Sequence, residues 1–299
     1  MTFPIPEGLV TATSHREGAA GTSWLTTLPA LIERFLTEWD CELDGDAWHG
    51  EVAIVIPVRR ADEPAALKIS FPHPGNRSEA PALRQFNGHG AVRLLKADEE
   101  AFAMLLERAG KEKLDSARSV EEAIEIAGDL ARRLAIPAAT VTPALAQATG
   151  PWEEELDQQI IAAPGPLPWP EINLARATIR SLASDPTTTM LHGDLHFGNV
   201  LRATREPWLT IDPKGWRGTA AFDAFTVVAG RREDLKEVTD LHGALQARVQ
   251  RYACAAGVNL DVALACVQAR ATSSYLHQQL HAGAWFDLEL LRCAMRITS

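Results

Sequence analysis

Three polar residues in one short stretch have the types and the spacing that phosphoryl transfer requires. Asp194 is followed five positions later by Asn199, and Asp212 comes thirteen positions after that. A carboxylate can accept the proton of an attacking hydroxyl, and carboxylate and amide oxygens are suitable ligands for Mg²⁺. Kinases use the same Asp-x-x-x-x-Asn spacing, with a later Asp for the metal. We therefore expect Asp194 to be the catalytic base, and Asn199 and Asp212 to bind Mg²⁺.

The segment between Asn199 and Asp212 is expected to be a β-hairpin. Short apolar runs at 200–202 and 208–211 flank the polar residues 203–207. Asn199 precedes the first strand and Asp212 ends the second, so antiparallel pairing would bring them roughly 5 Å apart. Asp194, one loop earlier, would then be near enough to meet a substrate hydroxyl beside the metal-bound phosphate.

Another chemistry is open to the same stretch, because His192, Asp194 and His196 alternate and could bind a transition metal from one face of a strand. Gly193 and Gly198 disfavour a regular strand, and no further ligand cluster stands out in the sequence. Metal-hydrolase chemistry is therefore the weaker hypothesis. We expect His192 to have a structural hydrogen-bonding role and His196 to line the site.

A cation for the phosphates of a nucleotide is expected at Lys68. This lysine lies inside the apolar run Ala-Ala-Leu-Lys-Ile-Ser at 65–70, which resembles the Val-Ala-Ile-Lys strand of kinases. Burying an unpaired ammonium group is costly, so a partner is required. The expected partner is Glu79, eleven residues later at the start of a predicted helix.

The rest of the nucleotide site is less clearly marked. No Gly-x-x-x-x-Gly-Lys-[Ser/Thr] loop occurs in the chain, which excludes a Walker-type kinase. The phosphate-binding loop is instead expected at residues 46–51, where Gly50 is the one glycine. Glu107 ends the last strand of the N-terminal part, at a hinge whose backbone groups would bind the nucleobase.

The elements that must position these residues change in character along the chain. An opening helix is expected at 24–39, after loosely structured residues 1–10, and a second helix at 78–86. Beyond residue 110 the sequence is mostly helical: Ser119 and Glu122 mark a capping box, 164–170 is a proline-rich loop, and helices resume from 233. Strands are expected at 42–50, 51–58, 65–70, 92–95 and 102–106, with turns at 59–64 and 97–100.

Composition narrows the class of protein. The 299 residues are 46% apolar and 23% charged, as in soluble globular proteins, and carry a formal charge of −10, which argues against a nucleic-acid partner. No window reaches the roughly 18 apolar residues of a membrane span, and no secretory signal is seen. Cysteines without CxxC spacing predict reduced thiols, with Cys254 and Cys266 in the core. We expect a cytoplasmic protein.

Several stretches resemble the aminoglycoside and hydroxyurea antibiotic resistance kinases, and within them the streptomycin 6-kinase type. The most specific are Leu-His-Gly-Asp-Leu-His-Phe-Gly-Asn-Val-Leu at 191–201 and Ile-Asp-Pro-Lys-Gly-Trp at 211–216. One departure is visible: the family usually has an acid where this chain has Thr219, before the retained Asp223. Weaker matches lie at Trp24 with 28–29, in the strand of Lys68, and at 79–84, 90–95 and 104–108.

The resemblance implies an α+β, protein-kinase-like two-lobed fold. Residues 1–108 would form a small β-rich nucleotide-binding lobe, and residues 109–299 a larger, mostly helical catalytic and substrate-binding lobe. It implies the same roles for Asp194, Asn199 and Asp212 as the spacing does, and a supporting role for Asp223 beneath the catalytic loop. ATP with Mg²⁺ is the expected cofactor, and GTP stays open.

The expected activity is an ATP-dependent O-phosphotransferase that acts on a small-molecule hydroxyl, above all that of a cationic aminoglycoside-type antibiotic such as streptomycin. His196, Asp287 and Trp285 are the candidate substrate residues, since carboxylates bind cations and an indole can stack on a sugar ring. Two alternatives stay open: a kinase of a cellular metabolite such as a sugar, an amino alcohol or a hydroxyurea-like compound, and a nucleotide- or drug-binding protein without catalysis.

Overall fold

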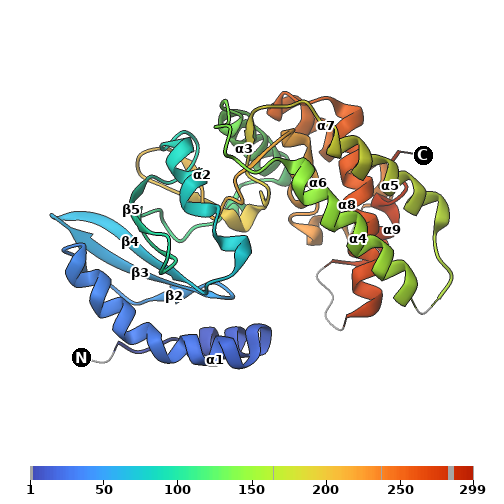
Figure 1. The fold of residues 1–299 in the computed structure, drawn as a ribbon. Helices are drawn as coiled ribbons and strands as arrows, with labels where there is room; N and C mark the ends of the chain where they lie inside the picture. The colour runs from blue at the N-terminus through green and yellow to red at the C-terminus, as the bar shows by residue number, and fades with distance from the viewer. Residues whose placement is uncertain (1–2, 164, 237, 282–285, 299) are drawn as a thin grey trace. The chain divides into compact units, whose positions relative to one another are not determined.

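The computed structural model describes residues 3–163, 165–236, 238–281 and 286–298, and Figure 1 shows its ribbon. The chain forms two compact units, Met1–Gly110 and Lys111–Ser299, each with its own hydrophobic core. The first unit is an antiparallel sheet covered by a long helix, and the second is mostly helical.

Residues 3–110, which are described without a gap, contain a six-stranded antiparallel sheet in the order β1-β3-β4-β6-β5, with β2 also paired to β3. Where one strand is predicted over 42–50, the structure has two short strands, β1 and β2, that pair with different parts of β3. The strands are β1 (Glu42–Leu43), β2 (Trp48–His49), β3 (Ala53–Arg60), β4 (Glu63–Ser70), β5 (Leu94–Asp98) and β6 (Ala103–Glu107).

The hairpin of β3 and β4 is longer than the sequence predicts, because its turn is confined to two residues. Ala61 and Asp62 both have left-handed backbone angles, with φ of 47° and 63°. That is the geometry of a two-residue hairpin turn that matches the twist of the strands. Lys68 consequently lies in a central strand, opposite Val55 on one side and Met104 on the other.

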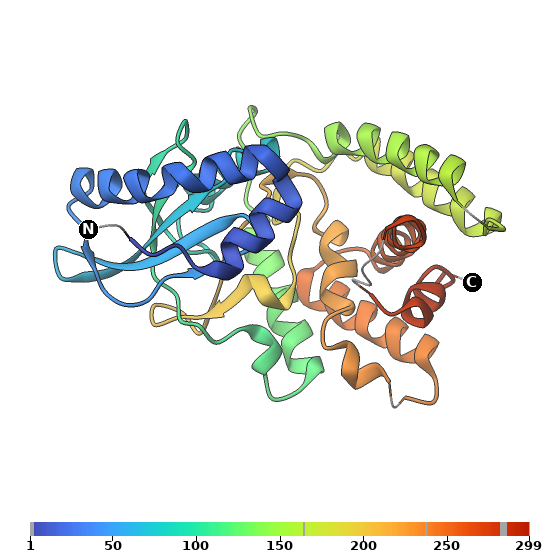
Figure 2. The same ribbon diagram turned by 90° about the horizontal axis from the view of Figure 1, so that it is seen from below.

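The opening helix, α1 (Glu7–Glu38), begins much earlier than the predicted helix at 24–39, and residues 7–10 are not loose as expected. The helix is bent at Gly18, whose φ of 58° and ψ of −134° are non-helical, and the bend is visible in Figure 2. One face of α1, which includes Leu28 and Phe35, packs with sheet residues such as Ile54 in the core of this unit. The predicted second helix is present as α2 (Glu79–Phe86).

The C-terminal unit is built from helices and four short strands in its described residues. In the predicted capping box, Ser119 Oγ accepts the Glu122 N–H (3.2 Å), but the Glu122 carboxylate accepts the N–H of Arg118 and not that of Ser119. The elements are α3 (Val120–Leu134), α4 (Leu145–Ala162), α5 (Trp169–Ala183), β7 (Met190–Leu191), β8 (Val200–Arg202), β9 (Trp208–Thr210), β10 (Trp216–Arg217), α6 (Ala224–Val228), α7 (Leu241–Ala256), α8 (Leu260–Leu280) and α9 (Leu288–Ala294).

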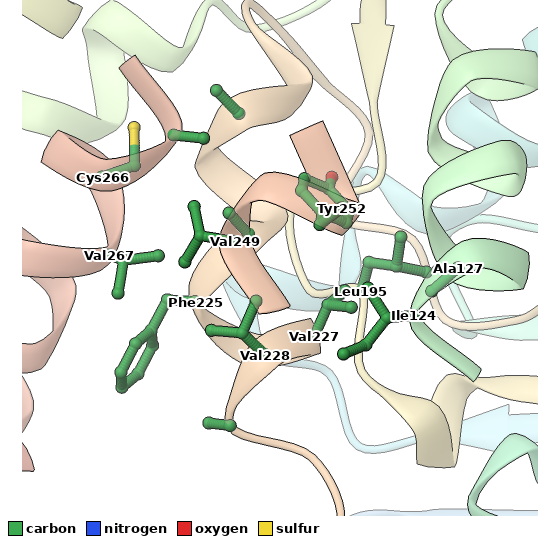
Figure 3. Packing of buried hydrophobic residues seen from close by; sticks show 14 of the residues in the cluster. Ile124, Ala127, Leu195, Phe225, Val227, Val228, Val249, Tyr252, Cys266 and Val267 are labelled. Atoms are coloured by element: carbon green, nitrogen blue, oxygen red, sulfur yellow. The ribbon is translucent and has the colours of Figure 1, made fainter. Parts of the chain in front are cut away.

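The core of this unit gathers aliphatic and aromatic side chains from α3, α6, α7 and α8, as Figure 3 shows. Tyr252 is fully buried and donates its hydroxyl hydrogen to the Ala220 carbonyl (2.8 Å), so its one polar atom is satisfied. Cys266 is buried as expected, but the prediction for Cys254 is wrong, because that cysteine is exposed on α7. Within the described residues, no helix is long and apolar enough to cross a membrane.

The close contact of α3 with α7 depends on a glycine. A Cβ at Gly128 would lie 2.6 Å from the Ala255 Cβ and 3.1 Å from the Tyr252 carbonyl oxygen, far inside van der Waals contact. We expect Gly128→Ala to lower the free energy of unfolding by about 1–2 kcal/mol, because overpacking outweighs the gain of about 1 kcal/mol in helix propensity. Chemical denaturation measures this change.

The matched control is Gly150→Ala in α4, where an added Cβ would meet nothing within 4 Å. That variant should keep or gain stability, since only the propensity difference acts there. Equal effects of the two substitutions would contradict the packing argument.

Candidate active site

The predicted catalytic loop follows β7 and turns at Gly193, which has a φ of 84°. A Cβ at this position would lie 2.9 Å from the Lys214 Cβ and 3.0 Å from a ring carbon of Trp216. Only glycine fits such a backbone angle and such a close approach without strain. The loop therefore passes directly against the segment that follows Asp212.

His192 has the structural role that the sequence predicts. Its side chain is fully buried, its Nε2 lies 2.9 Å from the Ile211 carbonyl oxygen, and its Nδ1 accepts the Asp194 N–H (3.2 Å). Burial is the main cause that lowers the pKa of His192 to about 4, so the ring is neutral at physiological pH. Since both nitrogens are engaged with the backbone, the alternative of a metal site at His192, Asp194 and His196 is wrong.

Asp223 supports the loop on both sides of Asp194, as expected. Its carboxylate accepts the N–H of Gly193 (3.2 Å) and the N–H of Leu195 (3.4 Å). The side chain is fully buried, and this burial raises the pKa of Asp223 to about 6, although the Arg270 guanidinium acts in the opposite direction. The buried acid thus fixes the backbone from which the Asp194 side chain projects.

Thr219 has a structural role in the turn before Asp223. Its hydroxyl accepts the Ala221 N–H (3.2 Å) and so caps the short 3₁₀ helix Ala220–Asp223. Its own N–H is donated to the Asp185 carboxylate (2.9 Å). Thr219 therefore stabilises the turn that delivers Asp223 to the loop.

Asn199 and Asp212 lie at the open end of the predicted hairpin of β8 and β9. The Ile211 N–H bonds to the Asn199 carbonyl (3.0 Å), and Asp212 is the next residue, with a left-handed φ of 57°. The Asn199 side-chain amide donates to the Asp194 carbonyl (3.0 Å), which orients that amide. A side-chain amide oxygen and a carboxylate are hard oxygen donors that fit Mg²⁺.

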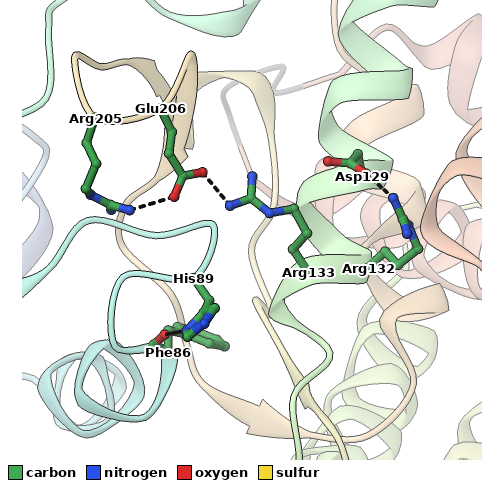
Figure 4. Close-up of polar contacts among 7 residues, drawn as sticks. All are labelled: Phe86, His89, Asp129, Arg132, Arg133, Arg205 and Glu206. Atoms are coloured by element: carbon green, nitrogen blue, oxygen red, sulfur yellow. Dashed lines mark hydrogen bonds and ion pairs between the residues drawn. The ribbon is translucent and has the colours of Figure 1, made fainter.

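The other end of this hairpin is fixed to α3. Glu206, in the turn between the strands, accepts a hydrogen bond from Arg133 of α3 and another from Arg205 (2.5 Å), as Figure 4 shows. The Arg202 N–H is also donated to the Glu112 carbonyl (2.8 Å). These contacts hold the whole hairpin, and hence its open end, against the helical unit.

In the N-terminal unit, the expected contact of Lys68 with Glu79 is present. The ammonium group lies 2.7 Å and 2.9 Å from the two carboxylate oxygens, and only 5% of Lys68 and 6% of Glu79 are exposed. The strand β4 carries the lysine, and the first turn of α2 carries the glutamate. A buried charge needs such a partner to offset desolvation.

Gly50 and Glu107, the other two residues predicted to bind the nucleotide, lie in the same unit. Gly50 lies between β2 and β3, and its N–H is donated to the Ala53 carbonyl (2.9 Å). Glu107 ends β6, where its N–H bonds to the Arg93 carbonyl (2.8 Å) and its carboxylate accepts the Arg93 N–H (3.0 Å). The Glu107 N–H is thus already engaged, so a backbone N–H for a nucleobase would have to come from a neighbouring residue.

A pocket of about 220 Å³ lies beside the catalytic loop within the helical unit. Its polar residues include Arg270, whose guanidinium stacks on the Phe222 ring at 4.5 Å from the ring centre and donates to the Phe222 carbonyl (3.2 Å). The lining residues that matter are Trp152, Trp216, Phe222, Arg270, Ser273 and Ser274. Their elements, α4, β10 and α8 among them, are far apart in sequence, so the sequence alone does not predict this pocket.

A second hollow of about 240 Å³ shares Trp152, Ser273 and Ser274 with the first and adds Glu155 and Gln159. Gln159 is 5% exposed, and its amide nitrogen donates to Glu155 (3.0 Å). Its side-chain oxygen is buried and has no hydrogen-bond partner in the structure. A buried acceptor without a partner is costly.

The predicted substrate residues lie elsewhere. His196 accepts the Gly198 N–H (3.1 Å) and starts the turn Phe197–Asn199. Asp287 is exposed and caps α9 by accepting the N–H groups of Glu289 and Leu290. Neither belongs to the described lining of the two hollows. Trp285 lies outside the residues that the structure describes.

Two buried residues, His192 and Asp223, make opposite contributions to the pH dependence of the free energy of unfolding. Asp223, with its pKa raised from 3.8 to about 6, keeps a proton in the folded state that the unfolded chain has lost, so its contribution falls as pH rises through that window. His192, with its pKa lowered from 6.5 to about 4, lacks a proton that the unfolded chain binds, so its contribution rises with pH.

Asp223→Asn should leave only the histidine contribution. We expect its free energy of unfolding to fall by about 2–3 kcal/mol more than that of the unmodified protein between pH 6.5 and 4. Urea denaturation across this range measures the slope, with Asp115→Asn, at an exposed position, as the control. Parallel pH profiles for the unmodified protein and Asp223→Asn would contradict the assignment.

Comparison with known proteins agrees with this geometry. The family model for aminoglycoside/hydroxyurea antibiotic resistance kinases matches residues 38–281. Streptomycin 6-kinase of Streptomyces glaucescens is 36% identical over 245 residues, which are 79% of this chain and 78% of that protein. Hydroxyurea phosphotransferase of Kitasatospora aureofaciens is 37% identical over 233 residues, or 73% and 66% of the two chains.

A solved structure shows the fold. The aminoglycoside phosphotransferase APH(4)-Ia, determined as a ternary complex with ADP and hygromycin B, superposes with a TM-score of 0.54 at 11% identity over 90% of this chain and 97% of that one. The α+β, protein-kinase-like fold that the sequence predicts is thereby confirmed, with a small β-rich unit and a larger helical one. This chain is a member of the aminoglycoside/hydroxyurea antibiotic resistance kinase family.

Proposed function

We propose that this kinase transfers the γ-phosphate of ATP to a hydroxyl group of an aminoglycoside-type antibiotic, with streptomycin as the first candidate. The observation that carries the proposal is the Asp194 loop, held on both sides by the Asp223 carboxylate and joined to Asn199 through the Asp194 carbonyl. Identity of 36% to a streptomycin 6-kinase supports the substrate class.

In this reaction Asp194 accepts the proton of the substrate hydroxyl as that oxygen bonds to the γ-phosphorus. The bond from the γ-phosphorus to the bridging oxygen breaks, and ADP leaves. Asn199 and Asp212 would hold Mg²⁺, which neutralises charge on the phosphates. Lys68, oriented by Glu79, adds a positive charge for the phosphates of the nucleotide. GTP is a possible replacement for ATP in the same scheme.

We assign residues 1–108 to nucleotide binding and residues 109–299 to catalysis and substrate binding. The two hollows lined by Trp152 are the proposed acceptor pocket, since they combine indole and phenyl faces with hydroxyl, carboxylate and amide acceptors. Such a lining suits a polyhydroxylated cation, whose N–H and O–H groups would donate to Glu155 and Gln159.

A coupled ADP-release assay with Mg²⁺ and ATP tests the function. We expect stimulation by streptomycin above the background hydrolysis, and not by other aminoglycosides to the same degree. Stimulation only by hydroxyurea, a sugar or an amino alcohol would keep the kinase and replace the substrate. Nucleotide binding without release of ADP or phosphate, with GTP tried as well, would indicate a binding protein.

The role of Asp194 is tested by Asp194→Asn. We expect kcat to fall about 10²- to 10⁴-fold, because the general base is lost, while the Kd for ATP changes little. Turnover and isothermal titration with ATP measure the two quantities. Asp115→Asn, the same substitution at an exposed aspartate, should leave both unchanged. Retained turnover in Asp194→Asn would refute the assignment.

The acceptor pocket is tested by Gln159→Leu, which removes the buried oxygen that has no partner. We expect KM for streptomycin to rise about five- to tenfold, the equivalent of one hydrogen bond, with KM for ATP unchanged. The thermal midpoint should change little, because the loss of the unpaired acceptor offsets the loss of the hydrogen bond from the Gln159 amide nitrogen to Glu155. Gln158→Leu, at an exposed neighbour on α4, is the control. Unchanged KM for streptomycin in Gln159→Leu would exclude this contact.

A further inference from the structure

The turn between β2 and β3, residues 50–52, is poorly equipped to hold phosphates by itself. A phosphate-binding turn offers backbone N–H groups to the anion, and glycines usually let the backbone come close. Here Gly50 is the one glycine in residues 46–51, and Glu51 adds a negative charge to the turn. The shape and the charge of this turn therefore need support from another part of the chain.

That support comes from the first half of α1, residues 7–17, which we call the N-terminal arm. The Thr13 hydroxyl donates to the Glu51 carbonyl (3.2 Å), and the Thr13 side chain is fully buried. Arg16, one turn further on, forms ion pairs with the Glu51 carboxylate and with the carboxylate of its neighbour Glu17 (3.3 Å). The arm thus holds both the backbone and the charge of the same turn residue.

The arm is itself fixed in place. Leu9 is fully buried in the core of the N-terminal unit, together with residues of α1 and of the sheet. A Cβ at Gly8 would lie 2.4 Å from the His49 Nε2, so the arm and β2 are in close contact. An anchored arm can transmit order to the turn, whereas a loose one could not.

The bend at Gly18 directs the arm. Its φ of 58° and ψ of −134° are open to glycine but strained for other residues, and a Cβ there would meet nothing within 4 Å. Figure 2 shows the two halves of α1 meeting at an angle. The family match begins only at residue 38, so the arm lies outside the part of the chain that the family model covers.

We infer that the N-terminal arm is a positioning element for the nucleotide: Thr13 holds the turn 50–52 in its phosphate-binding shape, and Arg16 offsets the charge of Glu51. This inference rests on the proposed function, because the turn matters only if ATP binds there. The arm then does for this turn what additional glycines do in other kinases.

Thr13→Val removes the hydroxyl and keeps the buried shape. We expect KM for ATP to rise about three- to tenfold, kcat to stay within twofold, and amide hydrogen exchange of residues 50–52 to speed up. Thr11→Val is the matched control, because the exposed Thr11 hydroxyl bonds only within its own helix, to the Glu7 carbonyl (3.1 Å). Equal KM values for ATP in the two variants would overturn the inference.

A double substitution separates the charge effect from direct phosphate binding. Arg16→Gln alone should raise KM for ATP, since Glu51 is then no longer offset. If Arg16 acts through Glu51, this increase disappears in the Glu51→Gln background. An increase that persists there would show that Arg16 contacts the phosphates itself, and the charge part of the inference would be wrong.

Gly18→Ala tests the bend through the backbone alone, because the added methyl has room. We expect KM for ATP to rise as in Thr13→Val, whereas Gly150→Ala in α4 leaves it unchanged. Lys68→Ala distinguishes a failure of the proposed nucleotide site from a failure of the inference about the arm. If it too leaves ATP binding intact, the proposed nucleotide site is wrong; if it abolishes binding while the arm variants have no effect, only the arm is wrong.

Discussion

The active site depends on one buried carboxylate. Asp223 has no exposure to water and would be costly to ionise, yet its two oxygens receive the N–H groups on either side of Asp194. Arg270 offsets part of that cost by its charge, and Thr219 caps the turn that carries the acid. Polar groups in the core of this unit therefore keep the Asp194 loop rigid.

The sequence was sufficient to predict the parts of the site that are local. Asp194, Asn199 and Asp212 lie within nineteen residues, and the hairpin that joins the last two follows from two short apolar runs with a polar segment between them. The contact of Lys68 with Glu79 is predictable because a lysine inside an apolar strand requires a counter-charge. In each case the local sequence or the cost of a buried charge is sufficient to predict the contact without the tertiary structure.

The missed parts depend on packing between distant segments. Trp152, Phe222 and Arg270 come together only when α4, the 3₁₀ helix Ala220–Asp223 and α8 pack against one another. Their positions in the sequence do not indicate a pocket. The arm of α1 was missed for a different reason. A glycine at position 18 is typical of a helix end. The buried residues before it, Leu9 and Thr13, are too few to show a helical period.

The hairpin of β8 and β9 carries Asn199 and Asp212, the residues that we propose to bind Mg²⁺, at one end and its ionic attachment to α3 at the other. Because paired strands are stiff along their length, Arg133 on α3 and Asp212, the proposed metal ligand, are joined through one rigid hairpin. Substitutions of surface residues are usually tolerated during evolution. Arg133 should instead be subject to selection for catalysis, although it touches neither substrate nor nucleotide in the proposed reaction.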